Sequence, residues 1–337
     1  MNWLKKKKTI YTTNIDFNKA ANILLCSDKN VIHGLGISII SILENISIPC
    51  VIHIAFNGEL PVEEEVRFTE LAQRYNTSLY FYWIDDREIK TLRSNSFITE
   101  TTYYRLLVPY VMNDLSIKKC LYLDTDIICV NNITSWYNQE LNQYIAAVSK
   151  DATSTPFFRE NHTCKSLGMK GTNYFNAGVM LINVSQYVSF DIGRKAIYLC
   201  SEHNYDAMDQ DVLNILLEGK VRFDDSYAYN CGMSVRNCEL PPEIYFVHFT
   251  GAKKPWKVCT SKIDEHTLSL GDASSWRYRY YKIWRLYNEA SPWKEVPFSL
   301  PKNATEWRYL SFLYLKNGKI IKSIKSYFKY LRYKINI

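Results

Sequence analysis

The chain has 337 residues, of which 47% are hydrophobic and 15% aromatic, and its formal net charge is +7. This composition excludes a disordered protein, and the length allows one large α/β domain with an appendage or two smaller domains. The longest strongly apolar stretch, residues 35–43, is too short to span a bilayer. No apolar segment or cleavage site follows the lysines at positions 5–8, so we predict no signal peptide and a cytoplasmic location.

Strands and helices are expected to alternate from the N-terminus. The patterns predict strands at 22–26, 51–56 and 78–84, with a helix at 34–43 after the first and a helix at 61–75 after the second. A strand, a polar turn and a buried helix form the first βα unit of a parallel sheet. In such sheets ligands bind at the carboxyl ends of the strands.

The later elements are less regularly spaced. They are expected, in chain order, as a helix start at 101–107, strands at 120–130, 144–149 and 243–249, a helix at 208–217, and helices from about 261 onward. The polar loop at 151–172 is long for a structureless connection, so we interpret it as a substrate loop.

Two carboxylates interrupt the apolar run at 120–130. Asp124 and Asp126 are two residues apart, and because strand side chains repeat with a period of two, both are expected to project to the same side. A divalent cation held by carboxylates and completed by phosphate oxygens is the usual arrangement at nucleotide sites. The alternative is a solvated turn after a buried strand, but two charges in an apolar run need a compensating partner.

His248 is the candidate third ligand, because it too lies near a strand end. The alternative is a structural, hydrogen-bonded histidine. Two carboxylates and one imidazole nitrogen favour Mn²⁺, with Mg²⁺ as the second choice. The metal would neutralise the two phosphates of a nucleoside diphosphate. Arg105 and Lys254 are candidates for fixed positive charge at this site, or for ordinary surface ion pairs.

Six segments resemble the retaining glycosyltransferases of family 8 and occur in that family's order. They are residues 27–30, 102–106, 122–126, 174–183, 209–211 and 248–256. Residues 291–331 also resemble a C-terminal domain of members that act on the enterobacterial lipopolysaccharide core. The resemblance implies an α/β chain with the GT-A nucleotide-diphospho-sugar transferase fold, a Rossmann-like mixed sheet, at 20–260. A helical region at 261–337 would follow it.

The resemblance also implies roles for individual residues. Asp124, Asp126 and His248 would be the metal ligands. The other implied contacts are Cys26, Asp28 and Asn30 with uracil and ribose, Arg105, Asp151, Asn176, Ala177, Asp209 and Gln210 with the sugar, and Gly251 and Lys254 with the diphosphate. The family often has an aromatic residue where Val31 stands and proline where Ala252 stands, so the stacking partner of the base is open.

Gln210 bears on the reaction mechanism. A covalent glycosyl intermediate needs a carboxylate close to the anomeric carbon, and an amide is a poor nucleophile. We therefore predict front-face displacement, in which the acceptor hydroxyl attacks from the side that the diphosphate leaves. The enzyme then mainly stabilises charge and positions the reactants. Asp151 and Asp209 would accept hydrogen bonds from sugar hydroxyls, the contacts that distinguish epimers.

The positive charge is concentrated at the C-terminus. From Trp307 onward the chain has eight Lys and Arg and no Asp or Glu. The basic residues recur every three or four positions beside an apolar face, which predicts a basic amphipathic helix. Such a helix binds an anionic membrane surface without spanning it, whereas the alternative is a packed domain helix. No nucleic-acid-binding motif accompanies the charge, so no nucleic acid partner is expected.

Together these features predict a UDP-hexose-dependent, Mn²⁺-dependent hexosyltransferase at the inner face of the bacterial inner membrane. It would transfer glucose or galactose to the lipopolysaccharide core through an α-1,2 or α-1,3 linkage. The alternatives are a family 8 transferase for another surface glycan, a self-glucosylating primer, a non-transferring UDP-sugar-binding protein and a metal-dependent phosphohydrolase. The nine scattered cysteines contain no Cys-x-x-Cys pair, which agrees with a reducing compartment.

Overall fold

The computed structural model describes residues 3–92, 100–152, 163–236, 239–251, 253–261 and 276–335. The chain divides into two compact units, Met1–His248 and Phe249–Ile337. Among the described residues, none of the helices combines the length and apolarity that crossing a bilayer requires.

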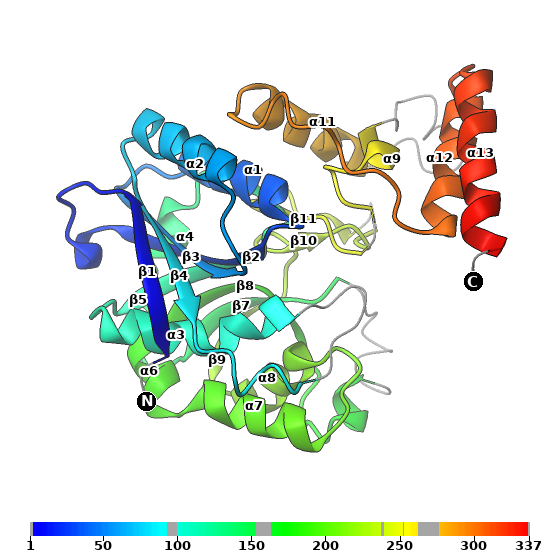
Figure 1. Ribbon diagram of the computed structural model, residues 1–337. Coiled ribbons are helices and arrows are strands. Elements are labelled where there is room, and N and C mark those ends of the chain that lie inside the picture. Colours follow the sequence, from blue (N-terminus) through cyan, green and yellow to red (C-terminus); the bar gives the residue numbers. More distant parts are fainter. Residues whose placement is uncertain are drawn as a thin grey trace. The chain divides into compact units, whose positions relative to one another are not determined.

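The first unit is built around an eight-stranded sheet with the order β1-β4-β3-β2-β5-β8-β7-β9 (Figure 1). Strands β4, β3, β2 and β5 run parallel, whereas β1 and β8 are antiparallel to their neighbours. The strands are β1 (Leu4–Tyr11), β2 (Ala21–Asp28), β3 (Cys50–Asn57), β4 (Ser78–Ile84), β5 (Lys119–Leu123), β7 (Ala146–Lys150), β8 (Phe175–Asn183) and β9 (Val221–Asp224). This arrangement confirms the α/β class and the mixed sheet.

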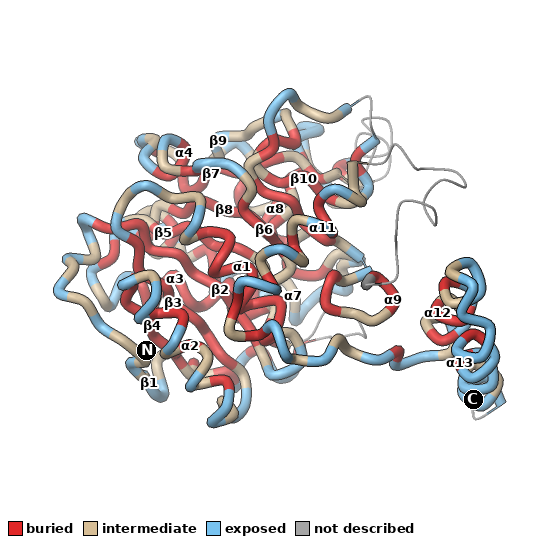
Figure 2. Tube along the Cα trace, turned by 90° about the horizontal axis from the view of Figure 1, so that it is seen from above, coloured by how far each residue is buried: buried red, intermediate tan, exposed pale blue. Residues whose placement is uncertain are grey.

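Helices cover both faces of the sheet, with α1 and α2 on one face and α3, α6, α7 and α8 on the other (Figure 1). The helices of this unit are η1 (Phe17–Lys19), α1 (Ile32–Leu43), α2 (Val62–Arg74), η2 (Glu100–Tyr103), α3 (Tyr104–Asp114), α4 (Thr134–Asn138), α6 (Val184–Ser189), α7 (Ile192–Glu202) and α8 (Asp209–Leu217). Strands β2 and β3 are buried along nearly their whole length (Figure 2), because they are predominantly apolar and lie between two helical layers.

Most of the predicted elements of this unit are confirmed. The three strands at 22–26, 51–56 and 78–84 are β2, β3 and β4, and the helices at 34–43 and 61–75 are α1 and α2. Pro61 occupies the N-cap position of α2, and three glutamates fill the first turn. The later predictions at 144–149 and 208–217 correspond to β7 and α8.

The prediction of one strand at 120–130 is wrong. The run forms β5 in the large sheet and β6 (Ile127–Cys129) in a separate three-stranded sheet with β11 (Phe246–His248) and β10 (Cys231–Gly232). Asp124 and Asp126 lie at the turn between the two strands, so they do not share one face of a strand. Two charged side chains are tolerated there because the chain leaves one sheet before it enters the other.

Strand β1 was not predicted, because four consecutive lysines resemble a solvated segment. Each ammonium group has a compensating partner on β4, on α2 or just beyond β4. Lys5 Nζ donates to Asp86 Oδ1 at 2.9 Å, and Lys8 pairs with Glu65. The charges of Lys6 and Lys7 lie over aromatic rings, with Lys7 Nζ 4.3 Å from the centre of Tyr80. Lysines on an edge strand also discourage pairing with another chain.

Helices make up most of the described part of the second unit, and the sequence predicted them from about residue 261 onward. This unit contains α9 (Val258–Ser261), α11 (Trp276–Glu289), α12 (Ala304–Lys316) and α13 (Ile320–Ile335). Helices α12 and α13 are joined through serines, because Ser311 Oγ donates to Ser323 O at 2.9 Å and Ser323 Oγ donates to Ser311 O at 2.8 Å. The basic amphipathic helix predicted near the C-terminus corresponds to α13.

Candidate metal and donor site

The site lies at one edge of the large sheet. Parallel strands β2 and β5 end there, and β8 begins there because it is antiparallel to β5, with Leu123 opposite Val179. Strand β7 ends beside the start of β8 and is followed by Asp151. The carboxylates after β5 and β7 therefore lie beside the Asn176-Ala177-Gly178 segment that opens β8.

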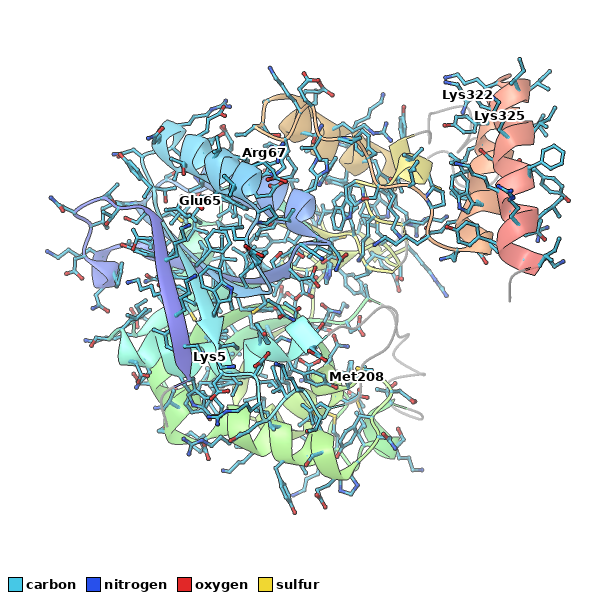
Figure 3. The ribbon with its side chains drawn as sticks, viewed as in Figure 1. Lys5, Glu65, Arg67, Met208, Lys322 and Lys325 are labelled. Atoms are coloured by element: carbon cyan, nitrogen blue, oxygen red, sulfur yellow. The ribbon has the colours of Figure 1, made fainter. Side chains whose placement is uncertain are left out.

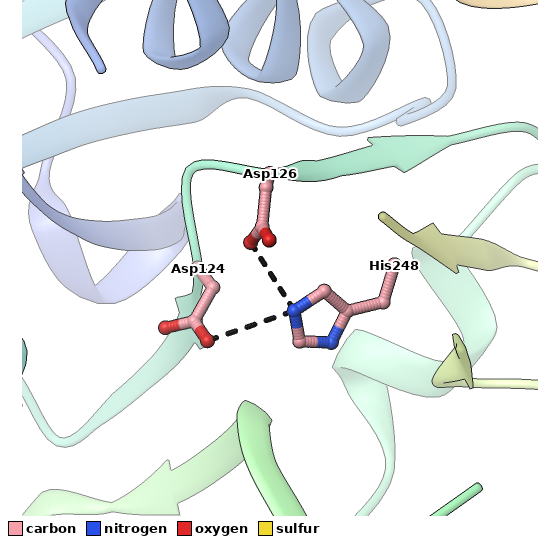
Figure 4. Close-up of side chains that lie close together, drawn as sticks. All are labelled: Asp124, Asp126 and His248. Atoms are coloured by element: carbon pink, nitrogen blue, oxygen red, sulfur yellow. Dashed lines mark ion pairs between the residues drawn. The ribbon is translucent and has the colours of Figure 1, made fainter. Parts of the chain in front are cut away.

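Asp124, Asp126 and His248 converge at this edge (Figure 4). His248 Nε2 lies 3.1 Å from Asp126 Oδ1 and 3.8 Å from Asp124 Oδ2. One ligand atom from each residue lies within 4.8 Å of the others. The pairing of β6 with β11 places Ile127 opposite His248, and this brings the imidazole to the carboxylates. The three predicted ligands thus meet, although the strand geometry expected for the aspartates is wrong.

Asn230 orients the imidazole. Its Nδ2 donates to Asn176 O and Asn176 Oδ1, at 3.3 and 3.0 Å, so its Oδ1 is the atom that accepts from His248 Nδ1, at 3.0 Å. With Nδ1 engaged by Asn230, Nε2 is the ring nitrogen that faces the two carboxylates, an arrangement that a bound cation would stabilise. The donor set therefore fits a divalent metal. Asn230 was not predicted as a site residue, because no motif spacing in the sequence links it to His248.

Gly178 leaves the space in which these ligands meet. A Cβ atom at this position would lie 2.5 Å from His248 Cε1, 2.7 Å from Asp124 Oδ2 and 2.9 Å from Asn176 Oδ1. Real Cβ atoms essentially never make contacts under 3.0 Å. Glycine is therefore required by the close approach of the metal-binding side chains.

Asp124 is held through Oδ1, whereas its Oδ2 is the atom that lies 3.8 Å from His248 Nε2. The Tyr122 hydroxyl donates to Asp124 Oδ1 at 2.6 Å, and Arg105 Nη1 donates to the same oxygen at 3.5 Å. Burial raises the pKa of Tyr122 well above its usual range, so the hydroxyl keeps the proton that it donates. Oδ2 of Asp124 is consequently left on the side of His248.

Arg105 and Asp209 form a buried ion pair beside Asp124. The guanidinium binds both carboxylate oxygens of Asp209, with Nη2 2.9 Å from Oδ1, and its Nη1 donates to Ala177 O at 3.3 Å. Burial opposes its charge, but the carboxylates of Asp209 and Asp124 outweigh that effect and raise the pKa of Arg105. The predicted sugar-site residues Arg105, Asp209 and Ala177 are therefore in direct contact.

Gln210 is held from both ends of its amide. Its Oε1 accepts the backbone N–H of Ala177 at 3.1 Å, and its Nε2 donates to Asp151 Oδ2 at 3.4 Å and to the Tyr174 hydroxyl at 3.1 Å. The structure thus brings Gln210 and Asp151 together, as the resemblance implied. Of the expected substrate loop at 151–172, residues 153–162 lie outside the described residues.

The predicted nucleotide contacts lie at the carboxyl end of β2. Cys26 is buried, and burial raises the pKa of its thiol well above its usual range. Asp28 Oδ1 accepts the backbone N–H of Asn30 at 2.7 Å, and both residues line a surface cavity of about 490 Å³. Gly251 and Lys254 belong to the second unit, and their contacts with the diphosphate stay predictions.

The site formed by Asp124, Asp126 and His248 lies at the edge of a mixed sheet where the parallel strands end. This sheet and this site are those of a glycosyltransferase with the GT-A fold. Residues 22–260 match the family model "Glycosyl transferase family 8", and residues 278–334 match "Glycosyl transferase family 8 C-terminal". The chain belongs to glycosyl transferase family 8, which confirms the resemblance described from the sequence.

Two curated relatives match nearly the whole chain. The lipopolysaccharide glucosyltransferase WaaO of Escherichia coli K12 is 29% identical and aligns over 94% of this chain and 92% of its own length. The lipopolysaccharide 1,3-galactosyltransferase of Salmonella typhimurium is also 29% identical, over 96% of this chain and 94% of its own. Among solved structures, galactosyltransferase LgtC in complex with donor and acceptor sugar analogues is 20% identical. It covers 86% of this chain and 99% of LgtC with a TM-score of 0.65, which supports the fold.

Proposed function

We propose that the chain transfers glucose or galactose from a UDP-sugar to the lipopolysaccharide core, through an α-1,2 or α-1,3 linkage and with retention of the α-configuration. The observation that carries the donor half is the meeting of Asp124, Asp126 and His248 at the edge that also holds Asp209 and Gln210. The acceptor half rests on the two relatives named as lipopolysaccharide glucosyl- and galactosyltransferases.

Asp124, Asp126 and His248 would hold the metal, with Mn²⁺ favoured over Mg²⁺ because one donor is an imidazole nitrogen. When bound, the ion supplies positive charge to the diphosphate as it leaves. Tyr122 fixes one oxygen of Asp124, and Asn230 fixes the tautomer of His248. These two residues prepare the site without contributing a ligand atom.

The sugar would lie against Asp151, Asp209, Asn176, Ala177 and Gln210. Asp151 and Asp209 would accept hydrogen bonds from sugar hydroxyls, and Arg105 holds Asp209 in place through the buried ion pair. The bond between the anomeric carbon and the diphosphate oxygen breaks while the acceptor hydroxyl attacks from the same face. The hydroxyl proton passes to the leaving phosphate oxygen. The nucleotide end would be bound by Cys26, Asp28 and Asn30.

The test is UDP release from UDP-glucose and UDP-galactose, measured with and without a lipopolysaccharide core acceptor and Mn²⁺. Transfer predicts release that depends on the acceptor, and a product whose new linkage is α by NMR. Acceptor-independent release of UDP would indicate hydrolysis of the donor in place of transfer, and release of UMP would indicate a phosphohydrolase that cleaves the diphosphate. Binding without release would indicate a silent sugar-nucleotide protein, and turnover only with another glycan would indicate a different acceptor. The Asp124→Ala variant should abolish turnover, whereas Gln210→Ala should slow it and still bind UDP.

We also propose that α13 attaches the chain to the anionic inner face of the inner membrane. The buried residues of α13 are two serines, Ser323 and Ser326, and Ser323 is hydrogen-bonded to Ser311 of α12. Its apolar residues with exposed fractions of 49% to 80% are Ile320, Ile321, Ile324, Tyr327, Phe328 and Ile335. At 3.6 residues per turn these form one stripe beside a basic flank that includes Lys322 and Lys325 (Figure 3). A packed domain helix would bury this stripe, so the amphipathic face supports binding to a lipid surface.

Vesicle sedimentation tests this attachment. The chain should bind vesicles that contain phosphatidylglycerol, and the paired change of Ile324 and Phe328 to Asp should release it. Changing Lys322 and Lys325 to Gln should weaken binding and reduce its salt dependence, since each cation contributes about 1 kcal/mol near an anionic surface. The matched control changes Val62 and Val66 on α2, which are 74% and 62% exposed, to Asp. Equal loss of binding in the control would contradict the assignment to α13.

A further inference from the structure

Asp211 is buried, and both of its carboxylate oxygens are occupied. Oδ1 accepts the Tyr174 hydroxyl proton at 2.5 Å, and Oδ2 accepts the backbone N–H of Ala207 at 2.8 Å. The side chain is one residue from Gln210, yet neither the sequence motifs nor the proposed reaction gives it a role. Its two partners come from different segments, since Tyr174 directly precedes β8 and Ala207 lies just before α8.

The first contact fixes the direction of a hydrogen-bond chain. Burial raises the pKa of Tyr174 above its ordinary value, so its hydroxyl keeps one proton, and that proton is donated to Asp211. The hydroxyl oxygen can then only accept from Gln210, whose Nε2 lies 3.1 Å away. At the other end of the amide, Ala177 N–H requires Oε1. Turning the amide by 180° would place donor against donor at Ala177 and leave Nε2 without Tyr174.

The second contact closes an unusual turn. Met208, the N-cap residue of α8, has φ 51° and ψ −122°, a conformation that residues with a Cβ rarely adopt. It is labelled in Figure 3. The bond from Ala207 N–H to Asp211 Oδ2 spans this residue. Asn214 then ties the helix to β8, because it bonds both backbone groups of Phe175 and the carbonyl of Gln210.

We infer that Asp211 is a positioning residue that acts through Tyr174 to hold the Gln210 amide with its N–H edge toward Asp151. This inference rests on the proposed function, because it concerns the same donor site. It predicts that turnover depends on the charge and acceptor character of Asp211, although Asp211 itself touches no substrate.

The Asp211→Asn variant tests this because it is nearly isosteric. Ala207 N–H would still require an oxygen, so the new Nδ2 would face the Tyr174 hydroxyl and donate to it. The Tyr174 proton would then point toward Gln210, which must either turn its amide or lose the contact. Misplacement of a reacting group by about 1 Å can cost 10²-fold in rate. We expect kcat to fall about 100-fold, while the KM for the UDP-sugar and the affinity for UDP stay within about twofold.

Tyr174→Phe and the double variant complete the experiment. Tyr174→Phe should lower kcat similarly, and the double variant should be no worse than either single variant, because both remove one chain of contacts. Tyr137→Phe is the matched control. It removes an equally buried hydroxyl, which accepts from Asn22 N at 2.9 Å near the opposite end of β2, and should leave kcat unchanged.

Wild-type turnover of a UDP-hexose separates this inference from the proposed function. If the wild type does not transfer sugar, the proposed function fails before the variants are considered. If it does, an unchanged kcat in Asp211→Asn or Tyr174→Phe overturns the inference. So does additive loss in the double variant, or a rise in KM without a fall in kcat.

Discussion

Replacing Gly178 with alanine should disable the metal site while leaving the fold intact. The added Cβ would lie 2.5 Å from His248 Cε1 and 2.7 Å from Asp124 Oδ2, whereas ordinary contacts begin at 3.4 Å. To reach 3.4 Å, His248 must move away from the new Cβ by about 0.9 Å (3.4 − 2.5) and Asp124 by about 0.7 Å (3.4 − 2.7). Overpacking of this kind costs about 1–3 kcal/mol of stability. Displacement of this size at a reacting centre costs about 10²-fold in turnover.

The assay is titration of Mn²⁺ in the presence of UDP, followed by turnover and thermal unfolding. The matched control is Gly171→Ala, where the new Cβ would meet only Glu218 Oε1, at an ordinary 3.5 Å. Weaker Mn²⁺ binding in Gly178→Ala, with the control unchanged, is the expected result. Wild-type Mn²⁺ affinity and turnover in a folded Gly178→Ala protein would refute the reasoning that the ligands meet around this glycine.

Asn230→Leu removes the acceptor of His248 Nδ1 and should weaken Mn²⁺ binding about 10–100-fold by calorimetry; unchanged affinity would count against the tautomer argument. Arg105→Met leaves the Asp209 carboxylate buried without its partner. Urea denaturation should show a free energy of unfolding lower by about 3–5 kcal/mol, and a loss below about 1 kcal/mol would contradict a stabilising role for this ion pair. Burial lowers the pKa of His53 from 6.5 to about 3, so the unfolded state alone takes up a proton between these values. Stability should fall by about 1.4 kcal/mol per pH unit below 6.5, and comparison of pH 7 with pH 5 should show a smaller fall in His53→Gln.

Much of the first unit could be predicted from the sequence, because its strands and helices carry strong periodic signals. The runs that form β2 and β3 are largely apolar and buried, and α2 follows an N-cap proline and has three glutamates in its first turn. The edge strand β1 escaped prediction because its lysines are stabilised by tertiary partners, such as Asp86 and Tyr80, that are far away in sequence. The residues next to β1 in the sequence do not indicate those partners.

The site was predictable as a set of residues but not as a geometry. Asp124 and Asp126 stood out as charges within an apolar run, yet their carboxylates meet because the chain turns between two sheets, and not because of strand periodicity. Asn230 could not be found, since its position beside His248 depends on the pairing of β10 with β11. The exposed stripe of α13 likewise required knowledge of which face packs on α12, and that face includes Ser323 and Tyr330.

The most direct test of the donor site is electron paramagnetic resonance of Mn²⁺ titrated into the protein with saturating UDP. The wild type should remove one equivalent of free Mn²⁺ from solution per chain, and Asp126→Ala and His248→Ala should each leave the ion free. Equal Mn²⁺ uptake by wild type and both variants would show that these side chains do not hold the metal.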